Sequence, residues 1–469
     1  MKRAVILFTR APVPGKTKTR MMPRLSPEEC SLLHKMFLLD IQRTLRGIDA
    51  DIYVFHASDT AQEEQLLKQL WEEKAAEEPF LKENSFGQPW SKQLKGFFPQ
   101  KGETLGVRMF QSICQVLEAG YESCVLIGTD VPELSREDLE AAFERLLDQD
   151  VVFGRTKDGG YYLIGMKQPV REAFELSSYG HSAVLEQTVS RIEEAGFSVG
   201  FTGTREDMDV FEDLLGYLQR ARSSKRLPTQ YTFFYVLGLL RISVIIPIYQ
   251  EEDTIRKMKR QLEEIQATKE AFHEIIFVDG GSKDATLSLL GEEYPVLHCS
   301  KSRSLQMNLG AKESTGDILF FLHCDSLLPP FPKREILEVI AQNPVGCFGI
   351  RFPSRNILMH ICSRLSNFRA EKRGLPFGDQ GIFLERSLFF ELGMFPELPI
   401  MEDYQFSLTL RAQKIPVRLT PHRLVTSGRR FPKGIIPKLL LMWKMYRLRA
   451  WYRQGVSVKK LADLYGDVR

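Results

Sequence analysis

The sequence predicts an α/β protein of two domains, each a mostly parallel sheet flanked by helices. Short β-rich runs alternate with amphipathic helical patterns in the first half, and the same alternation begins again at residue 242. A chain of 469 residues is also too long for a single ordinary core. Between the halves the chain turns basic and polar, and Pro228 follows. We therefore expect domains at 1–222 and 242–469, joined by a linker at 223–241.

The expected elements follow from these periodicities. In the first half, strands are expected at 4–9, 51–55, 124–127, 151–153 and 161–164, and helices at 27–45, 105–117 and 136–147. In the second half, strands are expected at 242–246, 274–278, 318–322 and 346–352, separated by segments long enough for right-handed helical crossovers. Ligands of open parallel sheets bind beyond the carboxyl ends of the strands, so the polar residues that follow each run are the candidates for function.

Composition places the chain among soluble globular proteins, with 43% hydrophobic and 26% charged residues. The formal charge of +3 is too small to argue for a nucleic acid partner. Seven cysteines without a CxxC pair, and a start without a signal peptide, lead us to expect reduced thiols and a cytoplasmic location. The longest apolar runs, 233–240 and 435–442, are far shorter than the roughly 20 residues that cross a bilayer. An alternative is contact with a membrane surface through the basic amphipathic stretch Lys433–Arg453.

Two polar clusters in the second half could hold a nucleoside. The first contains Pro247, Tyr249 and Glu251, and the second is Asp279 with two glycines and a serine after it. An acid at a strand end can hydrogen-bond a base or ribose, and glycines let the backbone approach a ligand closely. The alternative is that both clusters are ordinary turns and helix caps.

Two further clusters carry acids. Asp325 follows a very apolar strand, where one carboxylate could help to bind Mg²⁺ or Mn²⁺ and so neutralise a diphosphate leaving group. Glu402 and Asp403 precede a helical run, where they either cap the helix or serve catalysis. A general base must lie near the acceptor hydroxyl, so Asp403 is the candidate base and Glu402 could orient it.

In this order the four clusters resemble the family-2 glycosyltransferases of the glycosyltransferase-A fold, over residues 241–430. The segments 302–308, 378–381 and 426–430 resemble the subgroup called selenodomain-associated, or arsenosugar-biosynthesis, transferase 2. The resemblance implies inverting transfer from a nucleotide-activated sugar to a small acceptor. It implies a nucleoside contact for Asp279, a metal contact for Asp325 and the role of base for Asp403. Arg303, Gln306 and Arg429 are expected on the donor side, the two arginines at phosphates. One departure is that His323-Cys324-Asp325 carries a single acid where the family has an Asp-x-Asp motif.

The first half has a basic loop directly after its first strand. Lys16, Lys18 and Arg20 lie in a segment stiffened by two prolines, which could cradle phosphates or simply be solvated, and the spacing is not that of a P-loop. Asp130 follows the strand at 124–127, Asp158 precedes two glycines, and Asp209 follows a later strand. Asp130 and Asp209 are the candidate metal ligands, since a metal and cations must share phosphate charge in such a site.

These segments, with Arg108 in the motif 105–109, resemble the selenodomain-associated transferase 1 family over residues 2–218. That family is similar to nucleotidyltransferases, so the resemblances together imply two glycosyltransferase-A-like domains. The leading hypothesis is a bifunctional transferase whose halves serve one pathway. Alternatives are a nucleotidyltransferase that supplies the donor, or a non-catalytic nucleotide-binding module in the first half.

Overall fold

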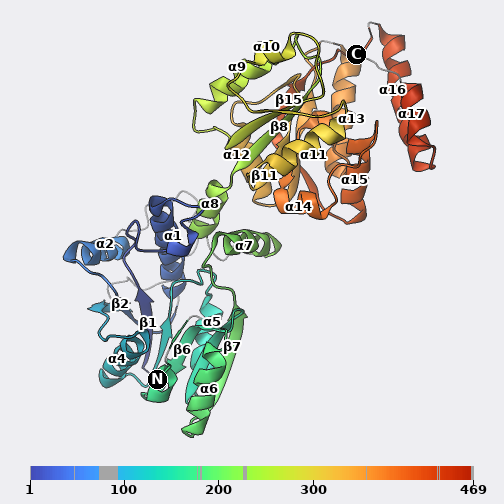
Figure 1. The fold of residues 1–469 in the computed structure, drawn as a ribbon. Helices are drawn as coiled ribbons and strands as arrows, with labels where there is room; N and C mark the ends of the chain where they lie inside the picture. The colour runs from blue at the N-terminus through green and yellow to red at the C-terminus, as the bar shows by residue number, and fades with distance from the viewer. Residues whose placement is uncertain are drawn as a thin grey trace. The chain divides into compact units, whose positions relative to one another are not determined.

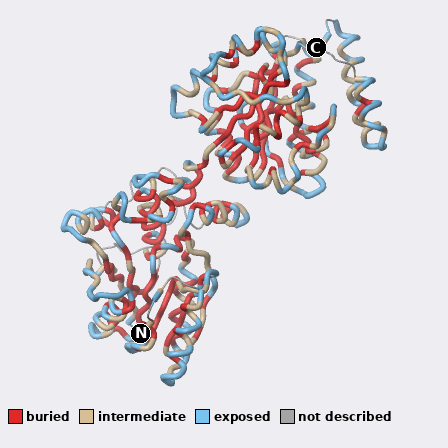
Figure 2. The backbone as a smooth tube through the Cα atoms, in the orientation of Figure 1, coloured by how far each residue is buried: buried red, intermediate tan, exposed pale blue. Residues whose placement is uncertain are grey.

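The computed structural model describes residues 2–465 except 47, 73–92, 177, 180–181, 225–229, 355, 430 and 433. Part of the expected linker, Arg430 of the motif 426–430 and Lys433 of the basic stretch thus lie outside the described residues. The chain forms two compact units, Met1–Val236 and Leu237–Arg469 (Figure 1). In both units the central strands are buried along most of their length (Figure 2).

The first unit is built on a seven-stranded sheet in the order β3-β2-β1-β4-β6-β5-β7. The strands are β1 (Arg3–Thr9), β2 (Asp51–His56), β3 (Leu94–Pro99), β4 (Ser123–Ile127), β5 (Val151–Thr156), β6 (Tyr161–Met166) and β7 (Val199–Arg205). The helices are α1 (Pro27–Leu45), α2 (Ala61–Glu72), α4 (Leu105–Glu118), α5 (Arg136–Arg145), α6 (Val184–Glu194), α7 (Phe211–Ser223) and α8 (Gln230–Leu239), with short 3-10 turns at Thr19–Met21 and Arg171–Phe174. Only β6 runs antiparallel to its neighbours in this sheet.

Alternation along β1 builds a core on each face of this sheet. Val5 and Leu7 belong to a cluster with residues of α1 and α5. Ala4 and Ile6 belong to a second cluster with residues of α4 and α6. Successive strand residues point to opposite faces, so a wholly apolar strand requires helices on both sides.

The second unit is built on an eight-stranded sheet in the order β10-β9-β8-β11-β14-β13-β15-β12. Its strands are β8 (Ile242–Ile248), β9 (Glu274–Asp279), β10 (Val296–His298), β11 (Ile318–Phe321), β12 (Ser326–Leu327), β13 (Val345–Arg351), β14 (Ile382–Glu385) and β15 (Val417–Thr426). Its helices are α9 (Ile255–Gln266), α10 (Thr286–Leu290), α11 (Arg303–Glu313), α12 (Pro332–Ile340), α13 (Ile357–Arg373), α14 (Arg386–Glu391), α15 (Glu402–Ala412), α16 (Ile435–Arg453) and α17 (Val458–Tyr465), with a 3-10 turn at Gly378–Gln380. Strands β10, β9, β8 and β11 are parallel, so their carboxyl ends meet at one edge.

Both sheets have more parallel than antiparallel strand pairs, which confirms the predicted fold class of two α/β domains with mostly parallel sheets. The segment 223–241 differs from a simple linker, because its residues 230–239 form α8. The start of α8 is held to α1, since Asp40 accepts hydrogen bonds from the backbone N–H groups of Tyr231 (3.3 Å) and Thr232 (2.8 Å). The apolar run 233–240, far too short to cross a bilayer, is the body of this helix.

Candidate active site

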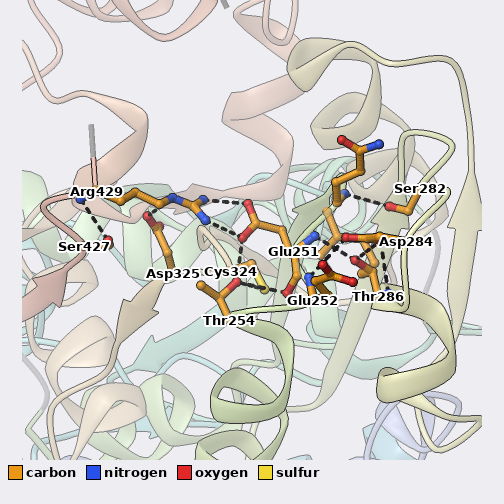
Figure 3. Close-up of polar contacts among 12 residues, drawn as sticks. Glu251, Glu252, Thr254, Ser282, Asp284, Thr286, Cys324, Asp325, Ser427 and Arg429 are labelled. Atoms are coloured by element: carbon orange, nitrogen blue, oxygen red, sulfur yellow. Dashed lines mark hydrogen bonds and ion pairs between the residues drawn. The ribbon is translucent and has the colours of Figure 1, made fainter. Parts of the chain in front are cut away.

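The loops after β8 and β9 are tied together in the second unit (Figure 3). The backbone N–H of Glu251 donates to Thr286 Oγ1 at 2.7 Å, and that of Gln250 donates to Ser282 Oγ at 2.9 Å. Gln250 takes a left-handed conformation with φ 51°. These bonds fix the direction in which the Glu251 side chain leaves its loop.

Asp279, at the end of β9, organises its own loop. Its carboxylate accepts from the N–H groups of Gly281 and Ser282 at 3.0–3.1 Å and from Ser282 Oγ at 2.6 Å. The side chain is 2% exposed. Burial and three local donors give Asp279 the role of shaping the Gly280-Gly281-Ser282 turn, and its expected nucleoside contact stays a prediction.

Gln306 also supports the site from beneath. It is 4% exposed, and its Nε2 donates to the carbonyl oxygens of Ile248 (2.8 Å) and Val278 (2.7 Å). The side chain thus joins the ends of β8 and β9. Both amide hydrogens are used in this structural role, and the expected donor contact of Gln306 stays a prediction.

Two other expected donor-side residues lie at the same strand end. Pro247 is a partly buried residue of β8 paired with Val278 of β9. The Tyr249 ring lies 4.8 Å from the Lys301 ammonium. An aromatic ring beside a cation is a surface that suits a base or a phosphate, and the donor-side role of Tyr249 stays a prediction.

Arg429 bridges two of the expected site acids (Figure 3). Its Nη1 and Nη2 donate to the two oxygens of Glu251 at 2.9 and 2.7 Å, and its Nε lies 3.4 Å from Asp325 Oδ2. The hydrogen bonds that Arg429 donates to Glu251 are the largest of the influences that raise the pKa of Arg429. Two carboxylates that share one guanidinium concentrate negative charge at this site. A metal ion bound to a phosphate could neutralise the same charge.

Asp325 fits a hard cation by its chemistry. It supplies carboxylate oxygens, and its side chain is 14% exposed behind Arg429. Within the described ranges, no group of three or more His, Cys, Asp or Glu side chains could hold a metal ion. A single carboxylate still suits Mg²⁺ or Mn²⁺, since such ions commonly take their remaining oxygens from substrate phosphates and water. Neighbouring Cys324 is buried, and burial raises the pKa of its thiol to about 12.

Asp403 lies beside the end of β11. Its Oδ2 accepts from the Gly378 N–H at 2.8 Å and its Oδ1 from its neighbour's N–H in α15 at 2.7 Å. A Cβ atom placed on Gly378 would lie 3.4 Å from Asp403 Oδ2 and 3.1 Å from His323 Nε2. Asp403 and His323, which lies two residues before Asp325, therefore lie beside the same small space around Gly378.

Buried Glu402 and partly exposed Arg303 form an ion pair next to this space. Arg303 Nη1 lies 3.3 Å from Glu402 Oε1, and the Glu402 side chain is 5% exposed. Burial and then the charge of Asp403 raise the pKa of Glu402, against the opposing charge of Arg303. Arg303 is thus committed to Glu402 and keeps only part of its hydrogen-bonding capacity for a phosphate.

Helix α16 adds two cations that sequence reasoning missed. Arg453 Nη1 donates to Tyr404 Oη at 3.3 Å, and Arg449 lies over the Phe377 ring at 5.3 Å and interacts electrostatically with Asp403. Burial is the main reason that the pKa of Arg449 is lowered. The signal available was a run of arginines in a helix without acidic partners, but nothing in the sequence showed where that helix packs.

In the first unit the basic loop is engaged by acids. Lys18, in a left-handed conformation with φ 52°, donates to Asp130 Oδ1 at 2.6 Å and to the Met208 carbonyl at 2.7 Å. Arg20 pairs with Asp209 at 2.7 Å. Lys18 and Arg20 thus meet the two candidate metal ligands.

The other expected site residues of this unit make local contacts. Lys16 turns to Asp59 and Glu63, both at 2.6 Å, and Arg108 donates to the nearby Gly102 carbonyl at 2.8 Å. Asp158 is exposed and accepts from Thr156 Oγ1 and the Gly160 N–H. No described contact brings Lys16 or Arg108 to the acids at 130 and 209, and their expected roles in nucleotide binding stay predictions.

Asp207 belongs to the same group of acids as Asp158 and Asp209, although it is not among the expected site residues. Burial, followed by the negative charge of Asp158, raises its pKa to about 6, and Asp209 and Asp213 add to the effect. Burial and neighbouring carboxylates both favour the neutral form of a carboxyl group, and groups shifted in this way cluster at functional sites.

We expect Asp207→Asn to stabilise the protein at neutral pH. With a folded-state pKa near 6 against an ordinary 3.8, the native state holds the proton more tightly, so wild-type stability falls as pH rises through this interval. The variant lacks this loss and should gain about 1 kcal/mol above pH 6, because solvent screening at this half-buried side chain reduces the full effect of the shift, with no gain near pH 4. Thermal unfolding from pH 4 to 7.5 in chelator measures it, with exposed Asp148→Asn as control. An equal gain at pH 4 would contradict the assignment.

No helix in the described part of the chain is long and apolar enough to span a membrane.

The chain is similar to known proteins in both halves. Residues 56–181 match the family described as "Uncharacterized protein conserved in bacteria (DUF2064)", and residues 243–397 match "Glycosyl transferase family 2". A Haemophilus influenzae "Uncharacterized glycosyltransferase" is 26% identical over 200 residues, 39% of this chain and 65% of that protein. An "Undecaprenyl-phosphate 4-deoxy-4-formamido-L-arabinose transferase" from Pseudomonas fluorescens is 29% identical over 159 residues, 30% of this chain and 45% of that protein. The chain thus spans less than two thirds of each of these relatives.

Solved structures with similarity include a putative nucleotide-diphospho-sugar transferase from Desulfovibrio desulfuricans, with 24% identity, a TM-score of 0.43, and coverage of 50% of this chain and 93% of that chain. A mannosyltransferase from Pyrobaculum calidifontis, in complex with GDP-Man and Mn²⁺, has 18% identity, a TM-score of 0.33, and coverage of 51% and 69%. The two family matches confirm the predicted fusion. The chain thus joins a segment that matches the DUF2064 family, residues 56–181, to a segment that matches glycosyl transferase family 2, residues 243–397.

Proposed function

We propose that the second unit transfers a sugar from a nucleotide-sugar donor to a small acceptor, with inversion at the anomeric carbon. One observation carries the proposal: Asp403 and His323, which lies two residues before Asp325, both lie beside Gly378. A base near the strand end that carries a phosphate-binding acid suits displacement of a diphosphate by a hydroxyl. The match to glycosyl transferase family 2 supports this reaction class.

In this mechanism Asp403 removes the proton of the acceptor hydroxyl. The acceptor oxygen forms its bond to the anomeric carbon as the bond from that carbon to the diphosphate oxygen breaks, and attack from the opposite face inverts the centre. The Gly378 N–H holds the Asp403 carboxylate in position. Glu402, paired with Arg303, positions the base rather than reacting.

The leaving diphosphate needs positive charge. Arg429 would exchange its contacts with Glu251 for the diphosphate, and Arg303 would add a second cation. Asp325 would hold Mg²⁺ or Mn²⁺, which supplies charge neutralisation of the leaving group when bound. The exchange at Arg429 would couple donor binding to the loop after β15.

For the first unit we propose a related sugar or nucleotidyl transfer in the same pathway, which would make the chain bifunctional. The meeting of Lys18 and Arg20 with Asp130 and Asp209 supports a phosphate and metal site. The alternative is a non-catalytic nucleotide-binding or regulatory module, because each of these cations already has an acid partner. Consumption of a nucleoside triphosphate with release of pyrophosphate would favour nucleotidyl transfer over a non-catalytic module.

The test of the main proposal is binding and hydrolysis of a panel of nucleotide sugars by the full chain, with Mg²⁺, Mn²⁺ or chelator. We expect at least one donor to bind in a metal-dependent way and to be hydrolysed slowly in the absence of acceptor. If no nucleotide sugar binds, the proposal fails.

A further inference from the structure

Helix α16 exposes large apolar side chains. Ile435, Ile436, Leu440 and Trp443 are 60%, 71%, 59% and 56% exposed, and Leu439 and Tyr446 are also exposed. Side chains spaced by three or four residues share a helix face. A run of this kind in the described structure of a single chain usually marks a surface that contacts another phase or molecule.

The exposure does not arise from a loosely attached helix. The second half of α16 is anchored to the unit: Leu448 is 1% exposed and packs in a cluster with Leu375, Tyr404 and Leu461 of α17. The Phe377 ring is contacted by Arg449 of α16 and by Arg369 of α13. The exposed half therefore projects from a fixed position beside the residues around Asp403.

Helix α13 carries a second exposed stripe. Ile357, Ile361, Leu365 and Phe368 follow spacings of four, four and three residues and are all exposed. Both helices contact Phe377. We call these four residues, with Ile435, Ile436, Leu439, Leu440, Trp443 and Tyr446, the α13–α16 face.

The charged side chains of α16 have one sign. From Tyr404 to Ala462 the sequence contains no Asp or Glu, while Lys and Arg recur throughout. The Arg447 guanidinium lies 4.6 Å from the Trp443 ring and 4.3 Å from the Trp451 ring. Apolar side chains with tryptophan beside arginine and lysine are typical of helices that lie at an anionic lipid surface.

We propose that the second unit docks on an anionic lipid bilayer through the α13–α16 face. The apolar residues enter the boundary between headgroups and acyl chains, and the surrounding cations contact lipid phosphates. An anionic bilayer explains the apolar and the basic character of the face together. A second copy of the chain would instead place its own cations against the cations of the first copy, and these would repel one another. Docking does not depend on the transfer reaction, so this proposal is independent of the proposed function.

The test is sedimentation of the full chain with vesicles of phosphatidylcholine alone or mixed with phosphatidylglycerol. We expect wild type to bind the mixed vesicles, and less so at high salt because surface charges are screened. The double variant Ile436→Glu with Leu440→Glu should bind at least about tenfold more weakly. Phe331→Glu, at a side chain of the same unit that is 56% exposed, should bind like wild type.

Three results would overturn the proposal. Wild type could stay in the supernatant with mixed vesicles, or the double variant could bind as well as wild type. Light scattering could instead show a wild-type dimer that the double variant dissociates while vesicle binding is unchanged, and a second copy would then be the occupant. Slow donor hydrolysis without vesicles should be the same in both proteins, so failure of docking is distinguishable from failure of the proposed function.

Discussion

Asp403→Asn should reduce turnover by roughly 10²–10⁴-fold while leaving donor binding unchanged, the loss typical of a missing general base. The amide has nearly the same shape and keeps one oxygen for the Gly378 or the α15 N–H. It cannot remove a proton from an acceptor hydroxyl. Steady-state kinetics with the donor and acceptor found in the panel, together with calorimetric titration of the donor, would separate turnover from binding.

The matched control for this variant is Glu397→Gln, a carboxylate-to-amide change at an exposed residue of the same unit. It should retain wild-type turnover. A variant at Asp403 that turns over normally would remove this residue from the role of base. A parallel loss of donor affinity and melting temperature would show instead that Asp403 mainly supports the fold around Gly378.

Asp325→Asn should abolish the metal-dependent part of donor binding. The change removes a negative charge from the space shared with Arg429, and even loss of a supporting partner costs metal sites roughly 10–100-fold in affinity. We therefore expect donor affinity in Mn²⁺ to fall by at least that factor and to match the affinity of wild type in chelator. Titration of Mn²⁺ with a nucleoside diphosphate provides a readout that does not depend on turnover.

Glu313→Gln, at an exposed position in α11, serves as the control for general charge effects. If Asp325→Asn bound the donor as tightly as wild type in Mn²⁺, the metal would be absent from the mechanism or held elsewhere. Arg429 would then be the principal cation at the leaving group.

Much of the fold was predictable because apolar runs and helical periodicity are local. The expected helix at 27–45 matches α1, where Ser26 and Glu29 form a capping box visible in the sequence. The expected strands at 242–246 and 274–278 match β8 and β9 to within two residues. Helix α8 was missed because a run without polar alternation carries no clear period.

The site was only partly predictable, since a motif gives residue types but not directions. Asp279 and Gln306 belong to recognisable motifs, yet both point into the protein and bond backbone groups. Arg429 and Asp325 are about a hundred residues apart and meet only because the loop after β15 crosses to the end of β11. The placement of Arg449 near Asp403 depends on how α16 packs, which is a tertiary fact.

Helix α8 has a practical consequence for dividing the gene into halves. Its first turn is held to the first unit by hydrogen bonds to Asp40. At its end, the Leu240 N–H donates a hydrogen bond to the Leu237 carbonyl. The next residue, Arg241, already belongs to the second sheet, because its backbone pairs with Asp317. A cut between Leu240 and Arg241 keeps the helix whole, whereas a cut at 222 would leave its apolar side chains on the start of the second polypeptide, where they would favour aggregation.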